Sequence, residues 1–331
     1  YMNEEVFKEM QEDTSGTFGG LGIEITTDNG FIKIISPIDD TPADKAGIQA
    51  GDYITHLNGD SVVDMNLKEA IDIMRGEVGT SITLTIIRGA EEPFDVELVR
   101  DTIKTASVKH RVLNDVGVLR VSTFNEQTTS GLKDSIQELE ESENPPIGYV
   151  LDLRNNPGGL LTESVSVSDL FLEQGEIVSI RGREKKDVQV YSAKKGDLIN
   201  QKPLVVLINE GSASASEIVA GALQDHDRAV IMGMKSFGKG SVQTIVPIDS
   251  GAIRLTIAKY YTPSGDSIQA VGIEPDVVVP RAELNIIDNY FTFRESDYQD
   301  ALDNETTDGS EEEATATDIL EEDYQLSRAV D

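Results

Sequence analysis

The sequence contains no cysteine and only three histidines among its 331 residues. The absence of cysteine excludes disulfide bonds, so cysteine usage gives no indication of the redox compartment. It also removes the thiolate ligands of structural zinc, and three scattered histidines do not replace them. No run approaches the roughly 18 consecutive apolar residues that span a membrane. We therefore expect neither a metal site nor a membrane-spanning helix.

Basic residues are scarce as well. The chain has 28 Lys and Arg against 60 Asp and Glu, a formal net charge of −32. Such a surface repels phosphates, so no nucleic-acid partner is expected. Residues 282–331 hold 16 of the acidic residues and two basic ones. We expect this segment to be an acidic C-terminal tail that is solvated or disordered, with partner binding as the alternative.

The chain opens with Tyr1-Met-Asn-Glu, which is polar and helix-like and carries no recognisable export signal. Residues 1–17 are therefore predicted to be a helical lead that is truncated, with any export signal lost upstream.

Residues 18–101 alternate short β-branched runs with turns. Strands are expected at 21–26, 31–35, 53–57, 81–87 and 94–99. One amphipathic helix is expected where Leu67, Ala70, Ile71 and Met74 follow helical spacing.

This unit opens with Phe18-Gly-Gly-Leu-Gly-Ile23, and its order of elements resembles a bacterial PDZ domain. The resemblance implies that backbone amides of Gly20, Leu21, Gly22 and Ile23 bind the C-terminal carboxylate of a peptide, which adds as a strand beside this segment. The alternative is that the glycines only form a tight turn.

Residues 102–281 have longer elements, with strands and helices in alternation. Strands are expected at 116–121, 148–153, 204–208, 229–232, 242–246 and 253–261, and helices at 128–141, 160–172 and 215–224. This alternation indicates an α/β core with a largely parallel sheet.

The chemistry is concentrated in Asn209-Glu-Gly-Ser-Ala-Ser-Ala-Ser-Glu217, where a strand gives way to a helix. A hydroxyl at a helix N-terminus lies beside free amides that can stabilise an oxyanion. The small side chains leave room for a substrate backbone. The alternative for Ser214 is a capping box with Glu217.

A second segment, Ser236-Phe-Gly-Lys-Gly-Ser-Val-Gln243, places a lysine among glycines. An ordinary lysine is only about 0.04% uncharged at pH 7. A lysine that acts as a base therefore needs a pKa lowered by about three, which costs roughly 4 kcal/mol. Burial among Phe237, Gly238, Gly240 and Val242 would favour the uncharged form. The alternative is an exposed turn lysine.

Other readings of these segments fit less well. His226 lies 12 residues beyond Ser214, about 18 Å along the same expected helix, which is out of reach. His56 and His110 lie in other parts of the chain, so a Ser-His-Asp triad is not expected. The sequence of segment 233–239 is similar to that of a phosphate-binding loop, but a strand is expected after it instead of the helix that such a loop requires.

Five motifs in order resemble those of the carboxy-terminal processing proteases, also called tail-specific proteases, over residues 10–280. They are Phe18-Gly-Gly-Leu-Gly-Ile23, Leu151-Asp-Leu-Arg-Asn-Asn-Pro-Gly-Gly-Leu160, Gly211-Ser-Ala-Ser-Ala-Ser-Glu217, Ser236-Phe-Gly-Lys-Gly-Ser-Val-Gln243 and Tyr261-Thr-Pro-Ser-Gly265. The resemblance implies an α/β protease core of βαβ units like those of ClpP and crotonase, with an inserted, mostly β PDZ domain. The expected domains are 1–17, 18–101, 102–281 and the tail 282–331.

The resemblance also implies a serine endopeptidase that needs no cofactor. Ser214 matches the family's nucleophile, Lys239 its general base, and Gln243 the residue that orients the lysine. Neutral Lys239 would take the Ser214 proton as the hydroxyl attacks a peptide carbonyl, and water would then hydrolyse the acyl-enzyme.

Further roles are implied for residues around this pair. Gly158 or Gly159, with the amide of Ala215, would form the oxyanion hole, although the same loop could be a plain turn. Asp225 matches an acidic position that matters for activity in some members, with a structural role as the alternative. Arg75 resembles an arginine that couples peptide binding to activation.

The implied substrates are proteins or peptides bound by their C-termini, and a homo-oligomer and an adaptor protein are further partners to consider. The implied location is the periplasm or another exported compartment. The alternative function is a catalytically silent PDZ module or scaffold.

Overall fold

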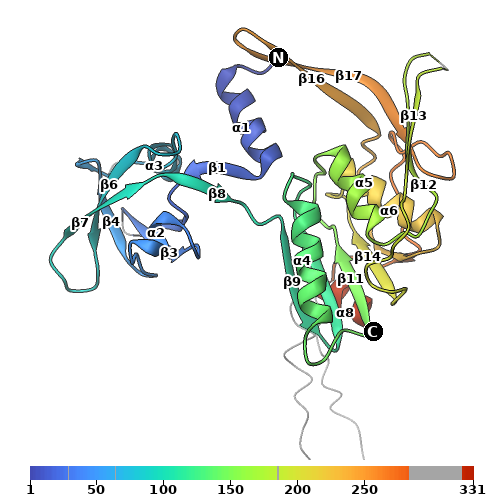
Figure 1. The fold of residues 1–331 in the computed structure, drawn as a ribbon, viewed down its shortest axis with the longest axis horizontal. Helices are drawn as coiled ribbons and strands as arrows, with labels where there is room; N and C mark the ends of the chain where they lie inside the picture. The colour runs from blue at the N-terminus through green and yellow to red at the C-terminus, as the bar shows by residue number, and fades with distance from the viewer. Residues whose placement is uncertain (29, 64, 185, 283–322) are drawn as a thin grey trace, which may run out of the picture.

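The computed structural model describes residues 1–282 and 323–331, apart from Asn29, Asp64 and Lys185. Figure 1 shows a small, mostly β unit and a larger α/β core, with helix α1 (Glu4–Ser15) between them. Helix α1 begins at Asn3, whose side chain accepts from the Val6 amide, and occupies most of the segment 1–17. Within the described residues, no helix is both long and apolar enough to cross a membrane.

The β unit contains the five strands and the helix expected from its sequence. Its elements are β1 (Thr17–Gly20), β2 (Ile23–Asp28), β3 (Phe31–Pro37), α2 (Pro42–Lys45), β4 (Tyr53–Leu57), β5 (Asp60–Ser61), α3 (Leu67–Met74), β6 (Ser81–Ile87), β7 (Phe94–Val99) and β8 (Asp101–Lys104). The main sheet has the order β2-β3-β4-β6-β7, which leaves β2 at an edge. Helix α3 packs on this sheet through Ala70 and Met74, as its periodicity predicts.

Strands β1 and β8 pair antiparallel where the β unit joins the rest of the chain, with Thr17 opposite Lys104 and Gly20 opposite Asp101. The chain therefore enters and leaves the β unit side by side. This arrangement is that of a unit inserted between α1 and the core (Figure 1).

The core elements follow the predicted alternation. They are β9 (Val108–Leu113), β10 (Val116–Val121), α4 (Thr128–Glu140), β11 (Gly148–Asp152), α5 (Leu161–Asp169), β12 (Glu176–Arg181), β13 (Val188–Ser192), β14 (Leu204–Ile208), α6 (Ala215–Asp225), β15 (Val230–Gly233), β16 (Ser241–Ile248), β17 (Gly251–Tyr261), β18 (Val277–Val278) and α8 (Tyr324–Val330). The central sheet has the order β18-β15-β14-β11-β10-β9 and is parallel except for edge strand β9. All five residues of β11 are buried, as expected for a strand covered on both faces.

The prediction of one largely parallel sheet was wrong for residues 242–246 and 253–261. Strands β16 and β17 form a hairpin within a second, antiparallel sheet of order β13-β12-β17-β16. Only Asp249 and Ser250 separate the two strands, and a connection that short can join only antiparallel neighbours.

The prediction of a solvated tail covered residues 282–331. Residues 283–322 lie outside the described residues, but the last nine depart from the prediction because they contain α8. Leu326 and Ala329 of this helix are buried against the sheet face that α4, α5 and α6 do not cover. The prediction was based on net charge, and net charge does not reveal a short apolar stripe within an acidic segment.

Candidate active site

Three side chains from the predicted site, those of Ser214, Lys239 and Gln243, line one cavity of about 260 Å³ together with Gly159. Ser214 lies between the carboxyl end of β14 and the start of α6. That edge of a parallel sheet is where α/β proteins place their ligands. The structure therefore brings the predicted nucleophile and base into the same cavity from segments 25 residues apart.

Ser214 has φ +55° and ψ −110°, a backbone conformation rarely adopted by residues other than glycine. Holding such a conformation costs about 1–3 kcal/mol, and strain of this kind concentrates at functional sites. The other two serines of the motif are fully buried: Ser212 Oγ donates to the Leu153 carbonyl at 2.8 Å and Ser216 Oγ to the Asn156 carbonyl at 2.9 Å. Of the three, Ser214 is the one that lines the cavity.

The fully buried Glu217 carboxylate connects the segments that carry Ser214 and Lys239. Its Oε2 accepts from the amides of Ser214 at 2.7 Å and Lys239 at 2.8 Å. Its Oε1 accepts from Ser236 Oγ and the Gly238 amide, each at 2.6 Å. A carboxylate with four donors is well satisfied away from water. The Glu217 side of the expected capping box is thus formed, and it serves to connect the two segments.

The lysine segment is fixed by its backbone. The Gly240 carbonyl accepts from the Tyr260 amide at 2.8 Å, and a Cβ on Gly240 would lie 2.3 Å from the Gln269 nitrogen, so only glycine fits. Lys239 is half-buried and forms no ion pair with any described carboxylate. Phe237 is 67% exposed, so the prediction that it helps to bury the lysine was wrong.

Gln243 lies on β16, immediately after an irregularity in the β16–β17 pairing between Val242 and Gln243. Such irregularities change the direction in which side chains point. The Gln243 side chain faces the cavity that also contains Lys239.

The predicted oxyanion loop runs from the end of β11 to the start of α5. The Gly158 amide already donates to Asn156 Oδ1 at 2.9 Å, whereas Gly159 lines the cavity. Gly159 has φ +147°, and a Cβ there would lie 2.0 Å from the Phe124 carbonyl oxygen, so the position requires glycine. The amides of Gly159 and Ala215 are therefore the better candidates for the oxyanion hole, and Gly158 is the weaker one.

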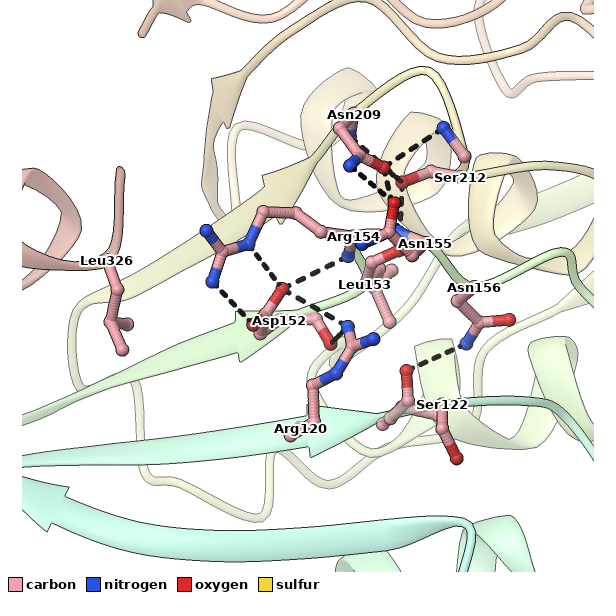
Figure 2. Close-up of polar contacts among 12 residues, drawn as sticks. Arg120, Ser122, Asp152, Leu153, Arg154, Asn155, Asn156, Asn209, Ser212 and Leu326 are labelled. Atoms are coloured by element: carbon pink, nitrogen blue, oxygen red, sulfur yellow. Dashed lines mark hydrogen bonds and ion pairs between the residues drawn. The ribbon is translucent and has the colours of Figure 1, made fainter. Parts of the chain in front are cut away.

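A network of hydrogen bonds and ion pairs between polar side chains holds this loop (Figure 2). Asn155 and Asn209 exchange two hydrogen bonds of 2.8 Å, which connect the loop after β11 with the loop after β14. Arg154 donates from Nε and Nη2 to the Asp152 carboxylate at 2.9 and 2.8 Å. Burial alone would lower the pKa of Arg154, but its hydrogen bonds to Asp152 and Asp323 outweigh burial and raise it. Arg154 therefore remains charged.

Helix α1 forms part of the cavity wall. Met10, Asp13 and Thr14 line the cavity together with Ser214 and Lys239. The start of the chain is fixed to the β16–β17 hairpin, where Met2 and Ala252 exchange backbone hydrogen bonds of 2.8 and 2.9 Å (Figure 1). The cavity is therefore bounded by α1, the β16–β17 hairpin and the core.

Asp225 is not among the residues that line this cavity. Its Oδ2 accepts from the Ser264 amide at 2.8 Å and so holds the Thr262–Gly265 turn. The structural alternative for Asp225 therefore fits the geometry better than a direct catalytic role.

The PDZ-like unit has its own groove, with a volume of about 460 Å³, between β2 and α3. Gly20, Leu21, Gly22 and Ile23 all line it, as predicted from the glycine loop. Arg75 also lines the groove, stacks 4.2 Å from the Phe18 ring centre and contacts Glu12 Oε2 of α1 at 3.5 Å.

Sequence reasoning missed several residues of the site. Glu217 was visible only as a capping partner, and Asn156 only as part of a loop. The wall formed by α1 had no local signal, because it depends on long-range pairing. Within the described residues, no cluster of three or more His, Asp or Glu is placed to hold a metal ion.

Comparison with known proteins identifies both parts of the chain. Residues 115–279 match the model of peptidase family S41, and residues 33–88 match the PDZ domain model. A carboxy-terminal-processing protease of Bartonella bacilliformis is 57% identical over 283 residues, which cover 84% of this chain and 65% of that protein. A probable CtpA-like serine protease of Staphylococcus epidermidis is 39% identical, covering 90% and 61%. The chain thus spans just under two thirds of the length of these relatives.

A solved structure of a photosystem II D1 C-terminal processing protease is also similar. It is 32% identical, with a TM-score of 0.50, and the match covers 84% of this chain and 77% of that one. The chain belongs to peptidase family S41 and contains a PDZ domain.

Proposed function

We propose that the protein is a serine endopeptidase in which Ser214 is the nucleophile and Lys239 the general base. The observation that carries the proposal is the shared cavity lined by Ser214, Lys239 and Gln243, with the Ser214 and Lys239 amides bound to one Glu217 carboxylate oxygen. That common anchor fixes the spacing of the two segments. Fixed spacing is what proton transfer between two side chains requires.

In the proposed reaction, uncharged Lys239 takes the proton of Ser214 as Oγ attacks the scissile carbonyl. The amides of Gly159 and Ala215 stabilise the oxyanion, and the Lys239 ammonium returns the proton to the leaving amine. Lys239 then activates water, which hydrolyses the acyl-enzyme. Gln243 holds the lysine side chain in position.

The PDZ groove supplies substrate selection in this proposal. The terminal carboxylate of a peptide binds at the 20–23 loop, and the peptide backbone pairs with edge strand β2. The aliphatic lining of Leu21, Ile23 and Ile71 favours an apolar last residue.

Arg75 provides a route from this groove to the catalytic cavity. It lines the groove and pairs with Glu12, and α1 carries Asp13 and Thr14 into the cavity wall. We propose that a bound peptide displaces Arg75 and thereby shifts α1, so that occupancy of the groove changes the population of open cavities.

The protease test uses an unfolded protein with an apolar C-terminus, incubated with wild type, Ser214→Ala and Lys239→Ala. We expect the wild type to cleave and both variants to lose cleavage. Cleavage that survives both substitutions refutes the proposal. Tight binding of the C-terminus by the wild type without cleavage at any pH would instead support the scaffold alternative.

The resemblance extends the proposal to location: periplasmic or otherwise exported, acting on exported proteins. Fractionation of cells that express the full-length gene product tests this. Recovery only from the cytosol contradicts it.

A further inference from the structure

The short C-terminal helix α8 completes one layer of the core. Leu326 is 3% exposed and Ala329 8% exposed, and both pack on Val118, Val150 and Leu207 of the central sheet. These three sheet residues face away from α4, α5 and α6. Helix α8 thus covers apolar surface on strands that lead directly into the catalytic loops.

The first turn of α8 contacts the start of the oxyanion loop. Asp323 caps the helix by accepting from the Leu326 amide at 3.1 Å. The same carboxylate accepts from Arg154 Nη1 at 2.7 Å and Nη2 at 2.6 Å, a two-point contact with an arginine side chain that is 13% exposed. Gln325 adds a third contact, since its Oε1 accepts from Arg154 Nη1 at 3.2 Å and its Nε2 donates to the Val279 carbonyl at 2.6 Å.

Arg154 is placed to transmit this contact. It is followed by Asn155, which is paired with Asn209 of the loop before Ser214, and five residues later the loop reaches Gly159 in the cavity. Figure 2 shows Arg154 between Leu326 of α8 and the Asn155–Asn209 pair. A shift of the Arg154 guanidinium therefore acts on the loop that supplies the proposed oxyanion donor.

We infer that α8 is a positioning element of the active site, in which Asp323 fixes Arg154 and thereby orders the loop from Asn155 to Gly159. This inference rests on the proposed function of that loop. Asp323 touches no substrate and acts through Arg154.

The test is Asp323→Asn in the full chain. Asparagine caps a helix as well as aspartate does, so α8 persists, whereas the charged contact with Arg154 is lost. The matched control is Arg328→Gln, which removes the exposed Arg328–Asp331 pair on the same helix. Leu326→Ala is the second variant, because it loosens the whole helix and leaves Asp323 unchanged.

Two readouts separate positioning from mere stability. Asp323→Asn should raise hydrogen exchange of the amides in 155–159 about tenfold and lower kcat about 3- to 10-fold, with KM within about twofold. Leu326→Ala should change both readouts in the same direction, and Arg328→Gln should change neither. A wild-type exchange rate or a wild-type kcat in Asp323→Asn overturns the inference. If the wild type itself cleaves nothing, the proposed function fails, and the exchange rates alone then decide whether α8 orders the loop.

Discussion

The PDZ groove and the catalytic cavity are built in opposite ways. The groove is lined by residues from two short stretches, 18–38 and 71–75, and most of its side chains are aliphatic. The cavity draws on α1, on the oxyanion loop and on the segments around Ser214, Lys239 and Tyr260, and it mixes hydroxyl, amine and amide groups. The proposed recognition groove is therefore built from nearby segments, whereas the proposed catalytic cavity depends on long-range assembly.

The difference has an energetic consequence. An aliphatic groove tolerates substitution, because binding is spread over several side chains and the peptide backbone. The cavity depends on a few buried polar contacts, each of which leaves an unsatisfied partner when it is lost. Substitutions at buried polar contacts of the core should therefore have larger effects than those in the groove.

Among substitutions outside the Ser214–Lys239 pair, Glu217→Ala should have the largest effect. It removes the acceptor shared by the Ser214 and Lys239 amides, so kcat should fall about 100-fold and the free energy of unfolding by about 3 kcal/mol. Steady-state kinetics and urea unfolding measure the two effects. The control is Glu210→Ala at an exposed carboxylate in the same loop. Unchanged kcat in Glu217→Ala would contradict the view that this carboxylate aligns the two segments.

Ile71→Asn should weaken peptide binding without affecting chemistry. It places an amide in the aliphatic groove, so the affinity for a peptide with an apolar C-terminus should fall about 30-fold, with kcat unchanged on a short substrate. Fluorescence anisotropy measures the affinity, and Asp72→Asn at an exposed position of the same helix is the control. Amidation of the peptide's terminal carboxylate should also weaken binding; equal affinity would argue against carboxylate capture.

Arg75→Ala should have a smaller effect, which reports on the coupling between the PDZ groove and the catalytic cavity. Its ion pair with Glu12 is partly exposed, so stability should change by less than about 1 kcal/mol. The stimulation of cleavage by a bound C-terminus should drop about threefold. Lys8→Ala is the control, since Lys8 contacts the same Glu12 carboxylate at 4.0 Å from within α1. Equal loss of stimulation in both variants would place the effect in Glu12 and not in the groove.

The smallest expected effect is a loss of stability of the docked helix α8 at acidic pH. Burial by itself would raise the pKa of Asp323, but its hydrogen bonds to Arg154 and the Leu326 amide, with the nearby charge of Arg111, hold it below the usual value. A lowered pKa stabilises the docked helix above about pH 4, and this contribution is lost as pH falls further.

Hydrogen exchange of the α8 amides, corrected for intrinsic rates, should therefore increase modestly between pH 5 and pH 3. The Asp152 carboxylate also faces Arg154, so Asp323→Asn is the control, and it should flatten this dependence. A wild-type pH dependence in that variant would contradict the assignment to Asp323.

Much of the fold could be predicted because local patterns agree with the final structure. The apolar run at 204–208 forms the strand β14 as predicted, and the helical spacing at α3 buries Ala70 and Met74 on one face. The antiparallel sheet was missed because its strands alternate with turns rather than helices. Helix α8 was missed because Leu326 and Ala329 form too short an apolar stripe to stand out in an acidic segment.

The candidate site shows the same division. Ser214, Lys239 and Gln243 were identified from local motifs and a resemblance, and the structure brings them together. The role of Glu217 could not be read from the sequence, since three of its four donors come from the segment 236–239 and only the Ser214 amide is a near neighbour. The choice between Gly158 and Gly159 needed the hydrogen bond to Asn156, which only the folded loop reveals.

The proposed activation of Ser214 by Lys239 is tested most directly by the rate at which Ser214 Oγ displaces fluoride from a fluorophosphonate and becomes phosphonylated. Wild type and Lys239→Ala are reacted with a fluorophosphonate probe across a range of pH, with Ser214→Ala as the unlabelled control. We predict that the wild type labels at Ser214 and that Lys239→Ala labels at least about 1,000-fold more slowly near neutral pH. Equal labelling rates in wild type and Lys239→Ala would contradict the activation of Ser214 by Lys239.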